Sequence, residues 1–368
     1  MSAPESSDVT NGGGIHCRTC GVHNPQGANF CSFCGNPLMA SDRFAEPKIT
    51  VFHSFTTAFR NIMVFSLIPL AILLAVNVMI LAGGISFVIP ETLDPAHGGV
   101  LFLVLPLSNP IVPFFELNGL VFAAYYLLLV IAIAASFALM VWRGLPTFKA
   151  ELGGIWNGKE RSQLYVVGTI FFALLAFQRL YYAAIGSIGI TASTPEFESE
   201  ELWALLYGFA SASVWEELII HVLLIGMPLF LVNYLVLGQR DNPKKYLLGG
   251  NIEIGQKEII LIIISASLFG FAHVVNWDIY KILPSLVAGI GFGYLFLKIG
   301  LYASICLHFA FNYLTITYSY TNNLLVGLVL SLLILAWTIF GSVYMISYAR
   351  SALRSTLKAS KRTKKIVN

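Results

Sequence analysis

Three apolar stretches in the second half of the sequence contain polar side chains that could carry chemistry. The stretches are SVWEELIIHVLL, FGFAHVV and SICLHFAFNYL. Ionisable groups are costly inside apolar helices and usually mark a function, so we expect these side chains to share a site. They are Glu216, Glu217, His221, His273, His308 and Asn312.

Carboxyl, imidazole and amide groups together favour hydrolysis. A glutamate in apolar surroundings can act as a general base on a water molecule. Imidazoles can position that water or protonate a leaving amine, and an asparagine amide can donate a hydrogen bond to the oxyanion of a tetrahedral intermediate. The sequence shows no serine that is paired with a histidine, which leaves activated water as the expected nucleophile.

Helical spacing divides these residues between two roles. Glu216 and Glu217 are adjacent, so on an α-helix they point about 100° apart and cannot both face one substrate atom. Glu217 and His221 are four residues apart and share a face, where they could form a structural pair that orients the helix. A single histidine in a span is more often packed than functional, and we interpret His221 in this way. The expected working site therefore combines Glu216, His273, His308 and Asn312.

A cysteine cluster near the N-terminus predicts a zinc site. The segment CRTCGVHNPQGANFCSFCG has the pattern C-x2-C, ten residues, C-x2-C. Two tight turns of this kind direct four thiolates to one point, which suits tetrahedral Zn²⁺; two disulfides are the alternative. Gly21 and Gly35 follow each pair, where a turn needs backbone freedom. The predicted ligands are Cys17, Cys20, Cys31 and Cys34.

The predicted metal is one structural zinc, because all four positions are filled by protein. A segment this small has no core of its own, so the metal would hold it together. Thiolate ligands indicate a reducing compartment and therefore a cytoplasmic N-terminus. The segment resembles the short zinc ribbons of many prokaryotic membrane proteins. The ribbon either docks a protein partner or substrate or is only a stable cap.

Composition sets the fold class. The chain has 368 residues, of which 57% are hydrophobic and only 11% charged, and its mean hydropathy is +0.76. Soluble domains carry about 25% charged residues. The length, cysteine count and hydrophobicity exclude secreted disulfide scaffolds and disordered chains. We therefore expect an all-α polytopic membrane protein with about eight transmembrane helices, preceded by a small zinc-ribbon module, and no nucleic-acid partner.

The apolar runs predict the order of segments along the chain. A disordered tail (1–14), the ribbon (15–38) and a linker or interfacial segment (39–60) precede a transmembrane domain (61–348) and a basic tail (349–368). The stretch 84–114 is rich in proline and is expected to be a long loop. Pro228 is expected to kink the fourth span, unless that span is a tilted helix. The predicted spans are 61–83, 115–142, 164–185, 203–236, 258–275, 281–298, 301–319 and 324–348.

Charge placement predicts the topology. Lysines and arginines follow the second, fourth, sixth and eighth spans, whereas the loop after the third span carries four glutamates and no basic residue. With eight spans, every basic loop lies on the side of the N-terminus. By the positive-inside rule that side is the cytoplasm, so both termini are predicted to be cytoplasmic, in a cell membrane of prokaryotic type.

The three motifs resemble those of the CAAX-processing and bacteriocin-processing (CPBP) family, which includes the type II CAAX prenyl endopeptidases. The adjacent glutamates, then Phe269 with His273, then His308 with Asn312 follow the family order, over about 165–320. The stretch with Gly289 and Gly293 is also similar, and such small residues allow close helix packing.

The resemblance implies a role for each matching residue. Glu216 would activate water and Glu217 would support it. His273 and His308 would complete the catalytic cluster, Asn312 would donate to the oxyanion, and Phe269 would shape the site. The family usually has arginine where this chain has His221. Two histidines and a glutamate could also bind a catalytic zinc, but the resemblance favours metal-free hydrolysis.

We therefore predict an intramembrane endopeptidase that cuts a membrane-anchored or lipidated substrate. The alternative is a non-proteolytic relative that acts as a membrane scaffold or in bacteriocin self-immunity. A proton-coupled transporter is a weaker interpretation, because no inverted repeat is apparent. Dependence on Glu216 separates the first two hypotheses.

Overall fold

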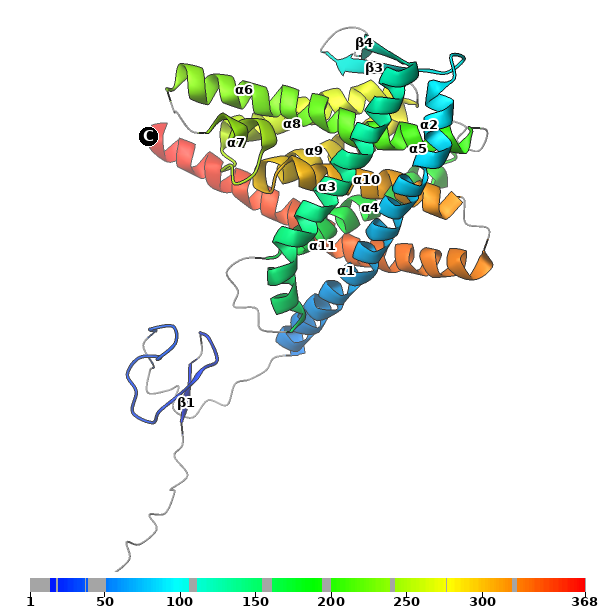
Figure 1. Cartoon of the computed structure of the whole chain (residues 1–368). Helices are drawn as coiled ribbons and strands as arrows, with labels where there is room; N and C mark the ends of the chain where they lie inside the picture. Colours follow the sequence, from blue (N-terminus) through cyan, green and yellow to red (C-terminus); the bar gives the residue numbers. More distant parts are fainter. Residues whose placement is uncertain are drawn as a thin grey trace, which may run out of the picture. The chain divides into compact units, whose positions relative to one another are not determined.

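The computed structural model describes two units, Met1–Ile62 and Met63–Asn368, which are treated separately below. The described residues are 14–17, 19–36, 38, 51–105, 111–153, 161–193, 200–238, 242–275, 277–319 and 323–367. The tail up to residue 13 and the linker 39–50 lie outside them. Figure 1 shows the order of the elements along the chain.

The first unit contains a minimal antiparallel sheet. Strand β1 (Ile15–His16) pairs with β2 (His23–Asn24). Its core consists of Ile15, Cys17, Cys31 and Leu38. This core is far too small to stabilise a fold by apolar burial alone. Residues 51–60, which were predicted to belong to the linker or interfacial segment, are the first residues of helix α1 (Val51–Gly83).

Six helices are long and apolar enough to cross a membrane, judged by length and composition over the described residues. Two further helices, α8 (Gln256–Ala272) and α10 (Leu301–Ser319), lie where the fifth and seventh spans were predicted. Helices therefore occupy all eight predicted span positions, and six of them meet this criterion: α8 has only 17 residues, and His308 and Asn312 lower the hydropathy of α10. The six are Asn61–Leu93, Gly119–Leu152 (α3), Gln163–Ser187 (α4), Leu202–Val236, Ile279–Lys298 and Leu324–Arg354.

The helices of the second unit pack in pairs around α10. Helix α11 (Leu324–Val367) lies along α4, α8 lies along α9 (Ile282–Lys298), and α10 contacts α3, α4 and α9 (Figure 1). Close approach depends on glycine at two of these contacts. A Cβ on Gly341 would lie 1.8 Å from the Phe172 carbonyl oxygen, and one on Gly289 would lie 3.0 Å from Ala266 Cα. The predicted close packing at Gly289 is confirmed.

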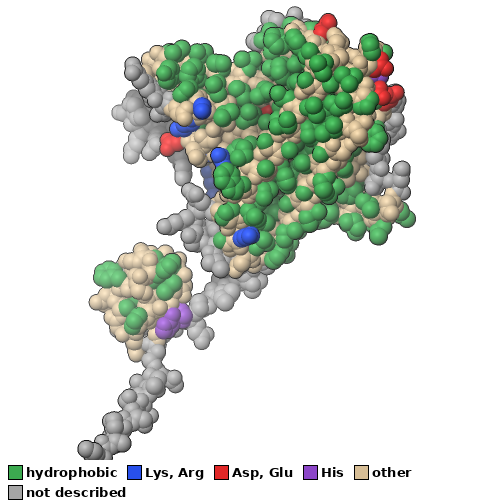
Figure 2. Space-filling model, in the orientation of Figure 1, with side chains coloured by type: hydrophobic (Ala, Val, Ile, Leu, Met, Phe, Trp, Pro, Cys, Tyr) green, Lys and Arg blue, Asp and Glu red, His purple; other side chains and the backbone are tan. Residues whose placement is uncertain are grey.

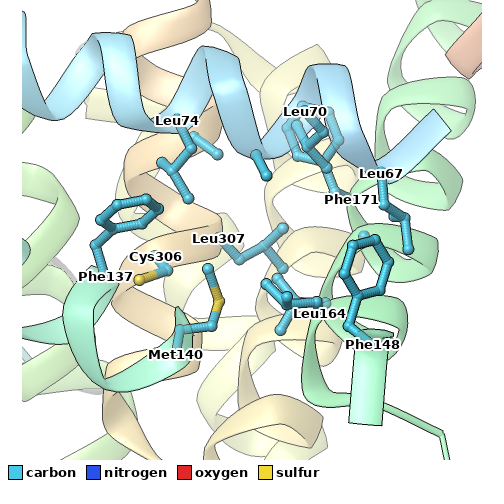
Figure 3. A pocket seen from close by; sticks show the side chains of 14 residues that line it. Leu67, Leu70, Leu74, Phe137, Met140, Phe148, Leu164, Phe171, Cys306 and Leu307 are labelled. Carbon is cyan, nitrogen blue, oxygen red and sulfur yellow. The ribbon is translucent and has the colours of Figure 1, made fainter. Parts of the chain in front are cut away.

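Apolar side chains fill the space between α1, α3, α4 and α10. Figure 3 shows a small cavity there, about 40 Å³ in volume, which Cys306 and Leu307 line from α10. Leu67 and Met140 line it from α1 and α3. Cys306 is buried in this layer as a small apolar side chain.

The surface of the second unit has the distribution expected in a bilayer. Hydrophobic side chains cover most of the visible face in Figure 2, and charged side chains lie at its edges. Among the exposed large hydrophobic residues are Ile131, Trp142 and Leu335. Contiguous apolar surface of this extent is unfavourable in water and favourable against lipid.

The stretch 84–114 is not the long loop that its prolines indicated. It forms α2 (Ile85–Leu93) and strand β3 (Gly98–Val104), which pairs in antiparallel register with β4 (Ile111–Asn118). The hairpin satisfies backbone hydrogen bonds that a loop would leave open. Pro113 sits beside the register shift in the ladder, where a strand tolerates proline. Pro90 lies within α2.

The fourth predicted span is helical but irregular. It runs through α5 (Leu202–Ser211), the π-helical segments η2 (Ala212–Glu216) and η3 (Leu218–Gly226), α6 (Met227–Phe230) and the π-helical η4 (Leu231–Val236). Pro228 lies in the first turn of α6, where the π segment before it accommodates the missing donor. At the C-terminus, α11 continues helically from the predicted span into the basic tail, as far as Val367.

Candidate active site

The two glutamates lie at the junction of two π-helical segments. Glu216 is the last residue of η2, and Glu217 connects it to η3. The preceding residue, Trp215, donates its indole N–H to the Phe102 carbonyl at 2.7 Å and so ties this junction to the β3–β4 hairpin. Wide helical turns of this type are frequent at functional sites, because they change the direction of individual side chains.

One imidazole contacts both glutamates. His308 Nδ1 donates to Glu217 Oε1 at 2.9 Å, while its Nε2 lies 3.6 Å from Glu216 Oε2. The Glu217 side chain is 1% exposed and the Glu216 side chain is 33% exposed. The two carboxylates therefore have different environments: one holds the ring from the interior, and the other faces the opposite nitrogen with more open surroundings.

His221 is the second imidazole on Glu217. Its Nδ1 lies 2.8 Å from Glu217 Oε2, and both side chains are 1% exposed. The ring packs near Phe292 and Phe296. The predicted Glu217–His221 pair is thus present, and Glu217 stands between two histidines from different helices.

His273 approaches the same cluster from the end of α8. It begins the short 3-10 segment η5 (His273–Val275), and its Nδ1 contacts the Phe269 carbonyl at 2.8 Å. A carbonyl can only accept, so Nδ1 carries the proton and Nε2 is the acceptor of the neutral ring. Phe269 packs edge-on against both His273 and His308. The ring of Phe269 thus contacts both histidines of the cluster, and its role in shaping the site stays a prediction.

Asn312 lies one turn beyond His308 on α10 and faces the fourth span. Its Nδ2 donates to the Phe209 carbonyl at 3.3 Å and to Ser213 Oγ at 3.2 Å. Ser213 in turn donates to the Phe209 carbonyl at 2.6 Å. Both amide hydrogens of Asn312 are therefore engaged in this state. Ser213 is occupied in the same way and is not bonded to a histidine among the described residues.

A cavity of about 640 Å³ opens beside this cluster. His273, His308 and Asn312 line one part of it, and apolar side chains from α4 and α9 form most of the rest. Lys281, the last residue of the 3-10 segment η6 (Ile279–Lys281), also lines it. This volume lies within the range of small-molecule and peptide sites. Two of the three motifs, those of His273 and of His308 with Asn312, therefore converge on one cavity, whereas the glutamates are not among its lining residues. The motifs gave no sign of Lys281.

The four predicted cysteine ligands form a separate cluster in the first unit. All four sulfurs lie within 4.8 Å of one another, and the cysteines are free. Cys17 and Cys34 sulfurs are 3.6 Å apart, and Cys20 and Cys31 sulfurs 3.5 Å. A tetrahedron with Zn–S bonds of about 2.3 Å needs sulfurs about 3.8 Å apart, so the set fits zinc.

Each knuckle supplies backbone support for a thiolate. Gly21 and Gly35 adopt φ values of 75° and 70°, as their positions predicted. Amide groups of Thr19 and Cys20 lower the pKa of Cys17. Those of Cys34 and Phe33 lower the pKa of Cys31 to about 6.

Asn24 supports the cluster and was not found by sequence reasoning. It is fully buried, donates to Cys31 Sγ at 3.5 Å and to the Val22 carbonyl at 2.8 Å, and accepts from Ser32 N and Oγ. Such second contacts orient metal ligands. Its place directly before a proline between the two knuckles was the only sequence signal, and many loop residues share it.

Two family models match the chain, one over each of the two regions described above. Residues 198–314 match the family model described as Type II CAAX prenyl endopeptidase Rce1-like, and residues 16–38 match a zinc-ribbon domain. No curated protein and no solved structure matches the chain. The first match covers less than half of the chain but contains the whole polar cluster. Residues 198–314 are thus similar to a family of membrane proteases, and the ribbon fits one structural zinc, as the motifs predicted.

Proposed function

We propose that this protein hydrolyses a peptide bond of a membrane-anchored or lipidated substrate with water activated by Glu216. The main support is the position of His308 between a fully buried glutamate, Glu217, and a partly exposed one, Glu216. Such an arrangement assigns one carboxylate to hold the ring and leaves the other able to act as a base. The cavity beside it supplies space for an extended peptide segment.

In the proposed first step, Glu216 accepts a proton from water while the water oxygen attacks the scissile carbonyl carbon. Glu216 Oε2 and His308 Nε2 are 3.6 Å apart, so a single water molecule can lie about 2.8 Å from each. His273 offers Nε2 as a further acceptor. Because Glu217 fixes the opposite nitrogen of His308, the ring does not need to reorient during the reaction.

In the second step, the tetrahedral intermediate collapses and the C–N bond breaks. Glu216, now a carboxylic acid, returns its proton to the leaving amine, which restores the starting carboxylate. We propose Asn312 as the oxyanion donor: it would turn one N–H from Ser213 Oγ towards the developing negative charge. A preorganised oxyanion donor contributes about 3–4 kcal/mol to the transition state, and Asn312 would give less than this because its N–H must first leave Ser213 Oγ.

The test compares new protein N-termini across the membrane proteome in cells that produce wild type, Glu216→Gln or Glu253→Gln at equal levels. Glu253 is an exposed glutamate outside the cluster and serves as the matched control. We expect a set of termini that is lost only in Glu216→Gln and that identifies the substrate. The same termini in all three cultures, with each protein folded, would instead support the non-proteolytic scaffold.

We further propose that both termini face the cytoplasm. The support is the clustering of basic loops after alternate predicted spans together with thiolate ligands that need a reducing compartment. In Figure 2, most visible Lys and Arg side chains lie on one side of the second unit, and most Asp and Glu side chains on the other. A fluorescent protein that folds only in the cytoplasm, fused after Asn368, should fluoresce; a periplasmic reporter at that position should be inactive.

We also propose that the ribbon binds a protein partner or the substrate. Phe30 and Phe33 are 64% and 74% exposed on its surface, which is unusual for aromatic side chains. Phe33→Ser should keep the zinc and weaken cleavage of a ribbon-dependent substrate. Unchanged cleavage and unchanged co-purifying proteins would leave the ribbon as a stable cap.

A further inference from the structure

Lys281 is a cation on the wall of the catalytic cavity that the proposed reaction does not use. It is the last residue of η6, directly before α9, and it lines the cavity together with His273, His308 and Asn312. Its Nζ lies 3.8 Å from the centre of the Trp277 ring. This contact fixes the ammonium group over an aromatic face, with its three donors available for another acceptor.

The acids around Lys281 do not neutralise it. Among the described residues, no carboxylate lies within ion-pair distance of its Nζ. The neighbouring Asp278 accepts instead from the backbone N–H groups of Ser193 and Tyr280. Glu216 interacts with Lys281 electrostatically from farther away.

The imidazoles of the cluster add no negative charge on this side. His273 and His308 both interact electrostatically with Lys281. Because Glu216 serves as the base, Lys281 remains positively charged in this part of the cavity. No described residue supplies its counter-charge.

A partly buried ammonium group in a largely apolar cavity is costly unless a partner is present. The cation–π contact with Trp277 offsets only part of this cost. An anionic group on the bound molecule would remove the remaining cost. It would also contribute a charge-assisted hydrogen bond at a fixed position in the cavity.

We propose that Lys281 binds a carboxylate of the peptide in the cavity and so selects substrates that carry an anionic group near the scissile bond. This inference rests on the proposed function, because it takes the cavity as the substrate site. A peptide carboxylate is favoured over a lipid phosphate because Lys281 lines the same cavity as His273, His308 and Asn312.

Binding can be measured without cleavage. Full-length wild type in phosphatidylcholine nanodiscs is titrated with N-dodecanoyl-leucine and with N-dodecanoyl-leucinamide, which differ only in the carboxylate. Tryptophan fluorescence reports binding, and Trp277→Phe identifies the part of the signal that comes from the ring beneath Lys281. We expect wild type to bind the carboxylate about tenfold more tightly, the effect of one hydrogen bond to a charged group.

Three variants assign the preference to this side chain. Lys281→Met keeps an apolar stem of similar length and should lose the preference, whereas Lys281→Arg should keep it. Lys298→Met, an exposed lysine at the other end of α9, should behave as wild type. Equal binding of both probes by wild type would overturn the proposal without any variant, and so would a preference that survives in Lys281→Met.

Two further results separate this inference from its alternatives. If phosphatidylglycerol in the nanodiscs abolishes carboxylate binding and the effect requires Lys281, the ligand is a lipid headgroup and the substrate assignment is wrong. If the carboxylate preference holds but no termini depend on Glu216, the proposed peptidase function fails while Lys281 remains an anion-binding residue. If wild type shows no carboxylate preference while Glu216-dependent cleavage is intact, the inference about Lys281 fails and the proposed function stands.

Discussion

Substitution of Gly289 by alanine tests whether helix packing sets the geometry of the catalytic histidines. A Cβ at this position would lie 3.0 Å from Ala266 Cα and 3.2 Å from Phe269 Cδ1. Carbon atoms in ordinary contact are about 3.5–4.0 Å apart. The backbone of α8 cannot yield locally, so α9 and the Phe269 ring must move by a few tenths of an ångström.

The expected loss follows from this overlap. Added methyl groups in packed cores cost about 1–3 kcal/mol of unfolding free energy. Phe269 also accepts the Nδ1–H of His273 and packs against His308, so its displacement reaches the catalytic cluster. Since a misplacement of about 1 Å can cost about 10²-fold in rate, we expect up to about a tenfold loss of Glu216-dependent cleavage.

Gly208 provides the matched control, because the same change there meets nothing. It lies within α5, and a Cβ on it has no atom within 4 Å. Alanine should therefore stabilise this helix by about 0.5–1 kcal/mol. A titration with denaturing detergent, monitored by circular dichroism, compares the unfolding stability of wild type, Gly289→Ala and Gly208→Ala. Equal stability of Gly289→Ala and Gly208→Ala would refute the packing argument, and a stability loss with full activity would refute the link to His273.

Two further substitutions test contacts that orient other groups. Asn24→Ala removes the donor to Cys31 and should weaken zinc binding about 10- to 100-fold in a chelator competition. Asn29 lies in a loop of the same ribbon and its side chain has no such contact to a cysteine, so Asn29→Ala should not weaken zinc binding. Equal zinc affinities of the two variants would contradict the supporting role of Asn24. His221→Ala leaves one side of the buried Glu217 without its partner and should cost about 3–5 kcal/mol of unfolding free energy. His23 is exposed, so His23→Ala should be neutral. A stable His221→Ala protein with normal cleavage would show that His308 alone suffices for Glu217.

The site residues were predictable because their chemistry conflicts with their surroundings. Glu217 and His221 stand in an apolar stretch, where periodicity alone would place only hydrophobic side chains. The four cysteines were predictable for a similar reason, since paired C-x2-C turns have few other uses in a reducing compartment. Both signals are local, so one sequence was enough to read them.

The hairpin and the π-helical turns were not predictable in this way. The prolines at 90–113 indicate breaks, but the pairing of Gly98–Val104 with Ile111–Asn118 depends on non-local hydrogen bonds. A π turn differs from an α turn by one residue per hydrogen bond and leaves no compositional mark. Lys281 was equally hidden, because only the fold brings η6 to the same cavity as α10.

The different roles of the two glutamates follow from the shape of an imidazole and not from the glutamates themselves. On a regular helix their side chains diverge by about 100°, which argues against a shared partner. His308, however, presents its two nitrogens on different sides of one ring, so it can meet Glu217 with Nδ1 and Glu216 with Nε2. The glutamate that is buried deeper must then hold a proton donor, because an unpaired carboxylate there would be too costly. The Glu216 side chain is one-third exposed, and its Oε2, although buried, has no hydrogen-bond partner among the described residues. This oxygen can therefore accept a proton from water, which is why we assign water activation to Glu216.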